Sequence, residues 1–368
     1  MTRQPAGFIK IRFLLNFLFC VLPHATCWIP AAICRALYKK LPLAPSIWNG
    51  FAGALMANTP PAQLQAILPP TIDVYDEWVS SRGIYPAVDV LEADNATCLL
   101  WIGPRAASKV ILFFHGGGYV MPLSLGHLDW MEHVRTEAAS AGLQLSVCAL
   151  EYDLIPAHPY PRQMIQGILA LKHLLNSGYR PSDIIFGGDS AGGHLALGVL
   201  AHLHRPRPTL EMEGQGHIDV QGTIKGCFLV SPLSSFEFNT PSYRRWFSAD
   251  VLTRRVVDKW GQYLVQDSPW QTEISDGDGW GMALDVRQSW WDNLNAVDFI
   301  LVTGGYEEVF SDHVQQLGAM LRKRSKGEVT LYMANETHDG PLMDFAAGRP
   351  PSATSKAIAD FIIACFKV

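Results

Sequence analysis

The sequence lacks the patterns that mark several large functional classes. Its 29 basic and 34 acidic residues give a formal charge of −5, and no long run carries a single sign of charge. Because nucleic-acid-binding proteins need a basic patch to meet the phosphates, we expect no nucleic-acid partner. The chain also has no internal repeat of the size of a solenoid unit, which excludes a repeat architecture.

Metal and disulfide patterns are missing as well. The seven cysteines form no Cys-x-x-Cys pair and no cluster with histidine, so the sequence predicts neither a zinc site nor a disulfide framework. The segment SDGDG at 275–279 starts like a calcium-binding loop, but Arg287 stands where the terminal glutamate of such a loop belongs. We expect no metal ion and no other cofactor.

The chain does contain a long uncharged segment near its start. Residues 13–34 carry no formal charge and are flanked by three basic residues on each side. This length suffices to cross a bilayer, but Pro23 and Pro30 would kink the helix, and a helix lying in the membrane interface is the alternative. We predict an uncleaved membrane anchor over residues 1–40 of a single-pass, membrane-associated protein, with the endoplasmic reticulum as the candidate membrane.

Residues 85–368 show strands that alternate with helices. Two segments of alternating polarity, 85–92 and 96–103, predict an antiparallel pair, and six continuous apolar runs predict strands buried on both faces. The fold class is therefore α/β, with a mostly parallel central sheet flanked by helices. The apolar runs are 109–114, 143–150, 183–188, 224–230, 298–302 and 328–333, and the helical patterns are 162–175, 190–203, 312–324 and 352–366.

Two further segments predict helical cover for this sheet. Residues 41–82 are expected to form short helices broken at Pro60-Pro61 and Pro69-Pro70, and residues from about 236 to 295 an inserted helical cap. The insertion holds six of the eleven tryptophans. So many large rings suit either an ordinary core or a lid over an apolar pocket. The polar segment 205–223 predicts an exposed loop.

The segment FGGDSAGGH, 186–194, follows a buried strand and opens a helix. Gly188 and Gly192 flank Ser190 at −2 and +2, where larger side chains would collide with their neighbours in a sharp strand-to-helix turn. Such a turn exposes the serine Oγ at the positive end of a helix dipole. Ser190 is therefore the candidate nucleophile, although a glycine-rich turn with an N-cap serine gives the same pattern.

A second glycine motif, FFHGGGYV at 113–120, also follows a buried strand. Three consecutive glycines are costly in conformational entropy, which favours a loop that a ligand approaches closely. A phosphate-binding loop is disfavoured, because neither a following Lys-Ser/Thr nor GxGxxG spacing is present. We predict an oxyanion hole formed by the backbone amides of Gly116, Gly117 and Gly118, with Ala191 across the site.

A serine nucleophile needs a general base and an acid that orients the base. His338 is the candidate base, because its loop follows the last strand and such sheets place their chemistry at the carboxyl ends of strands. The acid is expected in the segment TGGYEEVFSDH, 303–313, after the preceding strand. Glu307 and Glu308 both qualify by position, whereas Asp312 is better placed to cap the next helix.

Together, the two motifs resemble the hormone-sensitive-lipase branch of the α/β-hydrolases, particularly its membrane-anchored arylacetamide deacetylase and fungal steryl acetyl hydrolase members. The resemblance covers roughly residues 85–368 and implies an α/β-hydrolase domain over 41–368. The family carries its triad acid at the first position of D-x-L-x-D, which corresponds here to Glu308-Val-Phe-Ser-Asp312. The resemblance thus implies a triad of Ser190, His338 and Glu308, with glutamate in place of the usual aspartate.

The same resemblance implies a serine carboxylesterase or deacetylase that hydrolyses short-chain, acetyl esters of lipophilic alcohols through an acyl-enzyme. Its partners would be a small lipophilic ester and a membrane. Acyl transfer or cyclisation in a biosynthetic pathway is one alternative, and a non-catalytic ligand-binding homologue is another. The family's Tyr-Arg-Leu-Ala-Pro-Glu segment is Tyr152-Asp-Leu-Ile-Pro-Ala157 in this chain, so two charged residues that brace the loops are replaced.

Overall fold

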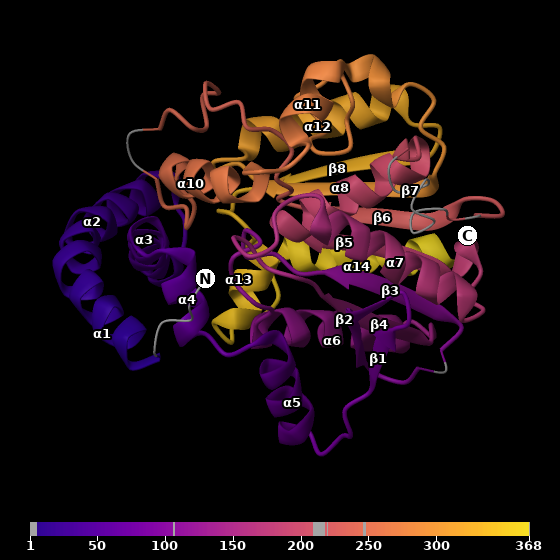
Figure 1. Ribbon diagram of the computed structural model, residues 1–368, viewed down its shortest axis with the longest axis horizontal. Helices are drawn as coiled ribbons and strands as arrows, with labels where there is room; N and C mark the ends of the chain where they lie inside the picture. Colours follow the sequence, from indigo (N-terminus) through magenta and orange to yellow (C-terminus); the bar gives the residue numbers. More distant parts are fainter. Residues whose placement is uncertain (1–5, 106, 209–217, 219, 246–247, 368) are drawn as a thin grey trace.

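A computed structural model describes residues 6–105, 107–208, 218, 220–245 and 248–367. In Figure 1 a central sheet lies between two layers of helices, and the N-terminal helices form a separate layer at the left edge of the view. Most of the polar segment predicted as a loop, as well as Trp246 of the predicted cap, lies outside the described residues.

The strands form one eight-stranded sheet in the order β1-β2-β4-β3-β5-β6-β7-β8. β2 runs antiparallel to both β1 and β4, and the remaining neighbours are parallel. The predicted antiparallel pair and the six predicted apolar strands are all present, so the fold-class prediction is confirmed. The strands are β1 (Val88–Leu91), β2 (Asp94–Ile102), β3 (Lys109–Phe114), β4 (Leu145–Glu151), β5 (Ile184–Asp189), β6 (Ile224–Val230), β7 (Val297–Gly305) and β8 (Glu328–Ala334).

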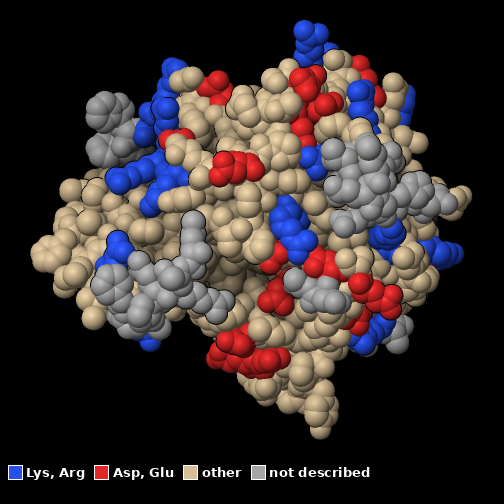
Figure 2. Space-filling model, viewed as in Figure 1, with Lys and Arg blue, Asp and Glu red and all other residues tan. Residues whose placement is uncertain are grey.

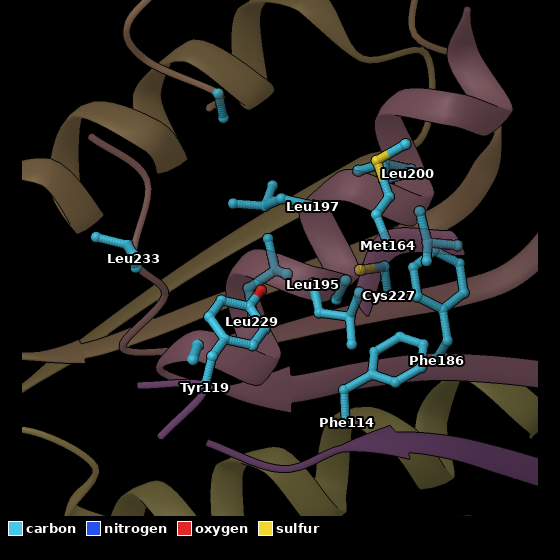
Figure 3. Close-up of a cluster of buried hydrophobic side chains, with 14 of the residues drawn as sticks. Phe114, Tyr119, Met164, Phe186, Leu195, Leu197, Leu200, Cys227, Leu229 and Leu233 are labelled. Atoms are coloured by element: carbon cyan, nitrogen blue, oxygen red, sulfur yellow. The ribbon is translucent and has the colours of Figure 1, made fainter. Parts of the chain in front are cut away.

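Each face of the sheet has its own hydrophobic core. On one face, Phe114, Phe186 and Leu229 of the strands meet Met164 of α7 and Leu195 of α8 (Figure 3). On the other face, the strands pack against α5, α6 and α14. The apolar runs are continuous because both sides of these strands are buried. The covering helices are α5 (Thr71–Ser81), α6 (Leu125–Ser140), α7 (Arg162–Asn176), α8 (Ala191–His204), α12 (Ser311–Arg324), α13 (Gly340–Ala346) and α14 (Ala353–Lys367).

The N-terminal region forms a helical hairpin. A π-helical turn, η1, lies just before the kink expected at Pro23, and Pro30 is accommodated inside α2. A Cβ at Gly50 of α3 would lie 3.0 Å from Ile29 Cα, so the backbones of α2 and α3 meet closely at this glycine. The segment Ile9–Lys39 is long and apolar enough to cross a membrane by length and composition. The elements are α1 (Ala6–Asn16), η1 (Phe17–Val21), α2 (Leu22–Lys39) and α3 (Leu43–Asn58).

Residues 41–82 are largely helical, whereas the described part of residues 236–295 holds two α-helices and a 3-10 turn joined by long irregular segments. Helices end before both proline pairs of residues 41–82, as expected. Both interpretations of the tryptophan-rich insertion apply to part of it. Trp260 lines an apolar cavity, whereas Trp290 and Trp291 are buried in the hydrophobic core. The additional elements are α4 (Pro61–Ile67), α10 (Arg254–Val265), α11 (Trp270–Asp276) and η3 (Gln288–Trp291).

Candidate active site

The predicted nucleophile lies in a sharp turn between β5 and α8. Ser190 adopts φ 52° and ψ −113°, a conformation that is strained for any residue with a side chain. A Cβ at either Gly188 or Gly192 would collide with the carbonyl oxygen of Phe114. The two flanking glycines are therefore required by close backbone packing, as the sequence indicated.

The structure brings the three predicted triad side chains together at the carboxyl ends of the strands. His338 Nε2 lies 2.8 Å from Ser190 Oγ, and His338 Nδ1 lies 3.1 Å from Glu308 Oε2. All three residues are buried. This geometry allows Ser190 to donate to the imidazole while the imidazole donates to Glu308. Their roles in catalysis remain predictions.

The three acids of the 303–313 segment occupy different environments. Glu308 faces His338, whereas the carboxylate of Glu307 is bound by Arg35 and Lys39 of α2, at 2.6 Å and 3.1 Å. The prediction that Asp312 caps α12 is wrong, because its side chain instead accepts a hydrogen bond from the amide of Ser242.

The glycine loop after β3 lies against the nucleophile turn. Gly117 and Gly118 have positive φ values of 97° and 62°, and a Cβ at Gly118 would collide with the ring of Trp260. The inclusion of Gly116 in the oxyanion hole is corrected, since its amide donates to Asp189 Oδ1 at 3.0 Å. An oxyanion hole at this position would therefore use the amides of Gly117, Gly118 and Ala191.

The glycine loop is supported by the stacked side chains of His115 and Tyr152. The rings of His115 and Tyr152 stack with their centroids 4.3 Å apart, and Tyr152 Oη donates to the His115 carbonyl oxygen at 2.7 Å. Burial lowers the pKa of His115 to about 3, so this imidazole is neutral and does not compete as a general base. The contact braces the loop even though the charged residues expected after Tyr152 are absent.

Two further aspartates contact His338, one at its backbone amide and one at its imidazole, and neither was identified from the sequence. Asp250 accepts hydrogen bonds from the amides of His338 and Val309, at 3.0 Å and 2.8 Å. Burial raises the pKa of Asp250 to about 6. Asp339 Oδ2 lies 3.1 Å from His338 Nε2. Asp339 directly follows the predicted base and could have been noticed, whereas Asp250 comes from the inserted segment and carries no local signal.

A cavity of about 580 Å³ opens onto these groups. Ser190 and His338 line it together with Gly117 and Gly118. The remaining lining is mainly apolar and comes from α3, α4, α5, α6, α10 and α13 as well as from loops. Examples are Met56, Leu64, Leu233, Val256, Trp260 and Phe310. The cavity therefore suits a lipophilic small molecule whose reactive group lies against Ser190 and His338.

Comparison with known proteins agrees with this architecture. A family model for the alpha/beta hydrolase fold matches residues 111–340, which is more than half of the chain. The chain is 35% identical over 209 residues to an esterase of Acinetobacter venetianus, covering 56% of this chain and 59% of that protein. It is 28% identical over 193 residues to arylacetamide deacetylase of Mus musculus, covering 49% and 45%.

The chain thus spans less than two thirds of the length of these curated relatives. A crystal structure of a thermostable esterase from Pseudomonas putida superposes with a TM-score of 0.61 at 17% identity, covering 84% of this chain and 89% of that one. At this identity the likeness shows the fold. On the family match, the relatives and the paired glycine motifs, the chain belongs to the hormone-sensitive-lipase-like branch of the α/β-hydrolase family.

Proposed function

We propose that this protein is a serine carboxylesterase or deacetylase that hydrolyses short-chain esters of lipophilic alcohols. The observation that carries the proposal is the contact of Ser190 Oγ with His338 Nε2 at 2.8 Å, on the floor of an apolar cavity. The names of the relatives, an esterase and an arylacetamide deacetylase, point to the same class of reaction.

The reaction follows from the positions of the proton donors and acceptors. Ser190 Oγ attacks the ester carbonyl while His338 Nε2 takes the hydroxyl proton, and Glu308 stabilises the imidazolium from the Nδ1 side. The imidazolium then gives the proton to the leaving alkoxide, which departs as the alcohol and leaves an acyl group on Ser190. Water repeats the sequence and releases the carboxylic acid.

Negative charge develops on the carbonyl oxygen in each half of the reaction. The amides of Gly117, Gly118 and Ala191 are the donors proposed to hold that charge. One such donor typically contributes about 3 kcal/mol of transition-state stabilisation. The positive φ values of both glycines turn the loop backbone at the cavity wall, where a side chain at position 118 would meet Trp260.

The N-terminal helices support the proposal of a membrane-associated enzyme with a lipophilic substrate. Leu14, Leu18 and Phe19 are exposed to 57%, 53% and 74%, and the surface over α1 and α2 is largely without charged side chains at the left of Figure 2. Trp48 of α3 is both exposed and part of the cavity lining. The apolar surface therefore extends to the cavity, which would let an ester enter from a lipid phase.

The packing of α2 favours the interfacial alternative over a spanning helix. α2 lies along α3, and its C-terminal end is ion-paired with Glu307 next to the triad. If α2 crossed the bilayer while packed in this way, α3 and part of the cavity lining would also lie inside the bilayer. We propose that α1 and α2 lie in the membrane interface instead, with their exposed apolar side chains in the lipid.

Hydrolysis of p-nitrophenyl acetate and butyrate by the full chain tests the proposed activity. Ser190→Ala should abolish turnover and labelling by a fluorophosphonate probe. Ser146→Ala, which changes a buried serine of β4 away from the cavity, serves as the matched control. Turnover by Ser190→Ala at the wild-type rate would overturn the assignment. Product analysis with added alcohols separates hydrolysis from acyl transfer.

A further inference from the structure

The imidazole of His338 contacts a carboxyl group at each of its two nitrogen atoms. Nδ1 faces Glu308 at 3.1 Å, as the triad requires, but Nε2 faces Asp339 Oδ2 at 3.1 Å as well as Ser190 Oγ at 2.8 Å. Nε2 is the atom that must take the serine proton. Asp339 therefore touches the reacting atoms directly, and the proposed triad mechanism gives it no role.

The contact between Nε2 and Asp339 depends on how many protons the two groups share. In an ordinary resting triad the neutral imidazole carries its single proton on Nδ1, and Nε2 accepts from the serine. An ionised Asp339 would then place a second lone pair against that of Nε2. The 3.1 Å contact becomes a hydrogen bond only when one further proton is present, either on Asp339 or on Nε2.

The surroundings of Asp339 are built to keep this carboxyl group in place. Asp339 has a positive φ of 51°, which is uncommon for residues other than glycine. Its backbone amide donates to Ser231 Oγ at 3.3 Å. It is 4% exposed. Among the described residues its only ion-pair partner is His338, and Oδ1 has no hydrogen-bond partner.

We propose that Asp339 holds an additional proton at the Nε2 edge of His338, so that Ser190 is activated only after this proton has been lost to solvent. While the proton is present, Nε2 is either already protonated or occupied by the Asp339 hydroxyl. It cannot accept the serine proton in either case. Once the proton leaves, Nε2 is free, and the acylation sequence of the proposed function, on which this inference rests, can begin.

The neighbouring charged groups favour retention of the proton near neutral pH. Asp189, Glu308 and Asp250 surround the pair, and all of them are buried acids. Burial raises the pKa of Asp339 to about 7. Burial alone would lower the pKa of His338, but Asp339 and then Glu308 outweigh it and hold that pKa well above its ordinary value.

Serine activation needs the form that has lost the additional proton, so activity rises as the pH rises through the titration of the His338–Asp339 pair. Removing Asp339 takes away the largest contribution that raises the pKa of His338. The acid limb of the activity profile should therefore move to lower pH.

The test measures kcat/KM for p-nitrophenyl butyrate, and the rate of inactivation by a fluorophosphonate, between about pH 5 and pH 9. Two variants are compared with the full wild-type chain. Asp339→Asn keeps the shape of the side chain, and Asp339→Gly suits the positive φ and leaves no group that could bond to Nε2. Asp344→Asn changes a nearby acid that pairs with Arg349 and is the control.

Each profile is normalised to its own plateau, so that a loss of overall rate is separated from a shift in pH. Both Asp339 variants should retain about tenfold more of their plateau activity at about pH 6 than the wild type, a shift of about one pH unit. A merely structural role would lower the plateau or the melting temperature without moving the limb.

An acid limb unchanged in Asp339→Gly, with Asp344→Asn also unchanged, would overturn the role of Asp339. A wild-type chain that neither turns over the ester nor reacts with the fluorophosphonate would instead overturn the proposed function. The two failures are therefore distinguishable.

Discussion

Arg35 of the N-terminal helix donates a hydrogen bond of 2.7 Å to Glu307, the residue directly before the candidate triad acid. The two residues are 272 positions apart in the chain. Glu307 is only 4% exposed, and its amide donates to the carbonyl oxygen of Glu336 in the loop that carries His338. The N-terminal helix is thus connected to both loops that hold the imidazole and its acid.

We expect Arg35→Ala to lower both stability and turnover, because the buried negative charge of Glu307 then loses one of its positively charged partners. Removing one partner of a buried ion pair costs about 3–5 kcal/mol, and the remaining contacts of Glu307 with Lys39 and Arg245 should bring the cost below that range. Thermal unfolding and kcat for p-nitrophenyl butyrate are the measurements. Lys10→Ala, on an exposed position of α1, is the control.

A double exchange, Arg35→Glu with Glu307→Arg, checks that the effect comes from the pair. It should recover part of the loss seen with Arg35→Ala. If Arg35→Ala retains the wild-type melting temperature and kcat, the helix has no influence on the loop, and the link inferred from this contact is wrong.

The adjacent glutamates should differ sharply in their effect on catalysis. Glu308→Gln replaces the carboxylate at Nδ1 by a neutral amide whose NH2 group can donate to Nδ1 and favour the wrong tautomer. It should lower kcat by about 1,000-fold or more, whereas Glu307→Gln should lower it less than about tenfold. The two substitutions are chemically identical and one residue apart, so each controls for the other. Equal losses of kcat would show that position 308 has no special role.

Gly118→Ala should disrupt the oxyanion loop, since the new methyl group would collide with Trp260. We expect kcat to fall about 100-fold. Gly142→Ala is the matched control, because Gly142 also has a positive φ, 80°, but has open space where a Cβ would be. That control should cost about 1 kcal/mol of stability and leave kcat unchanged. Full activity in Gly118→Ala would argue against an oxyanion hole at this loop.

The exposed face of the N-terminal helices should bind lipid. Phe19→Asp combined with Leu18→Asp should reduce co-flotation with phosphatidylcholine vesicles by about tenfold or more, because two large apolar side chains leave the interface. Turnover of soluble p-nitrophenyl acetate should stay unchanged. Tyr85→Asp replaces a side chain that is 95% exposed but lies outside this face. Vesicle binding equal to that of the wild type would contradict an interfacial helix.

The sheet and the nucleophile turn could be predicted because their signals are local. A strand buried on both faces requires a continuous apolar run, and the turn at Ser190 requires glycines at fixed offsets. Helix α6 was missed because Gly126 and His127 interrupt its apolar stripe. His127 is buried there through a local contact with the N-cap residue Ser124 and a distant contact with Asp189 of β5.

Other parts of the site depend on contacts between distant segments. By their position in the sequence, Glu307 and Glu308 were equally good candidates for the triad acid, and only the family resemblance favoured Glu308. The structure separates them through Arg35, which no local pattern connects to position 307. Asp250 likewise reaches the His338 amide from the inserted segment, 88 residues away. Among the described tryptophans of that segment only Trp260 lines the cavity, and the tryptophan content of the segment gave no indication of this.

The most direct test of the central claim is the mass of the full-length protein quenched during turnover of p-nitrophenyl butyrate, followed by peptide mapping. We predict a population heavier by one butyryl group, with the modification on the peptide that contains Ser190, and no such species in Ser190→Ala. An acyl group found on another residue, or turnover without any acylated protein in the wild type and with Ser190→Ala equally active, would contradict the account.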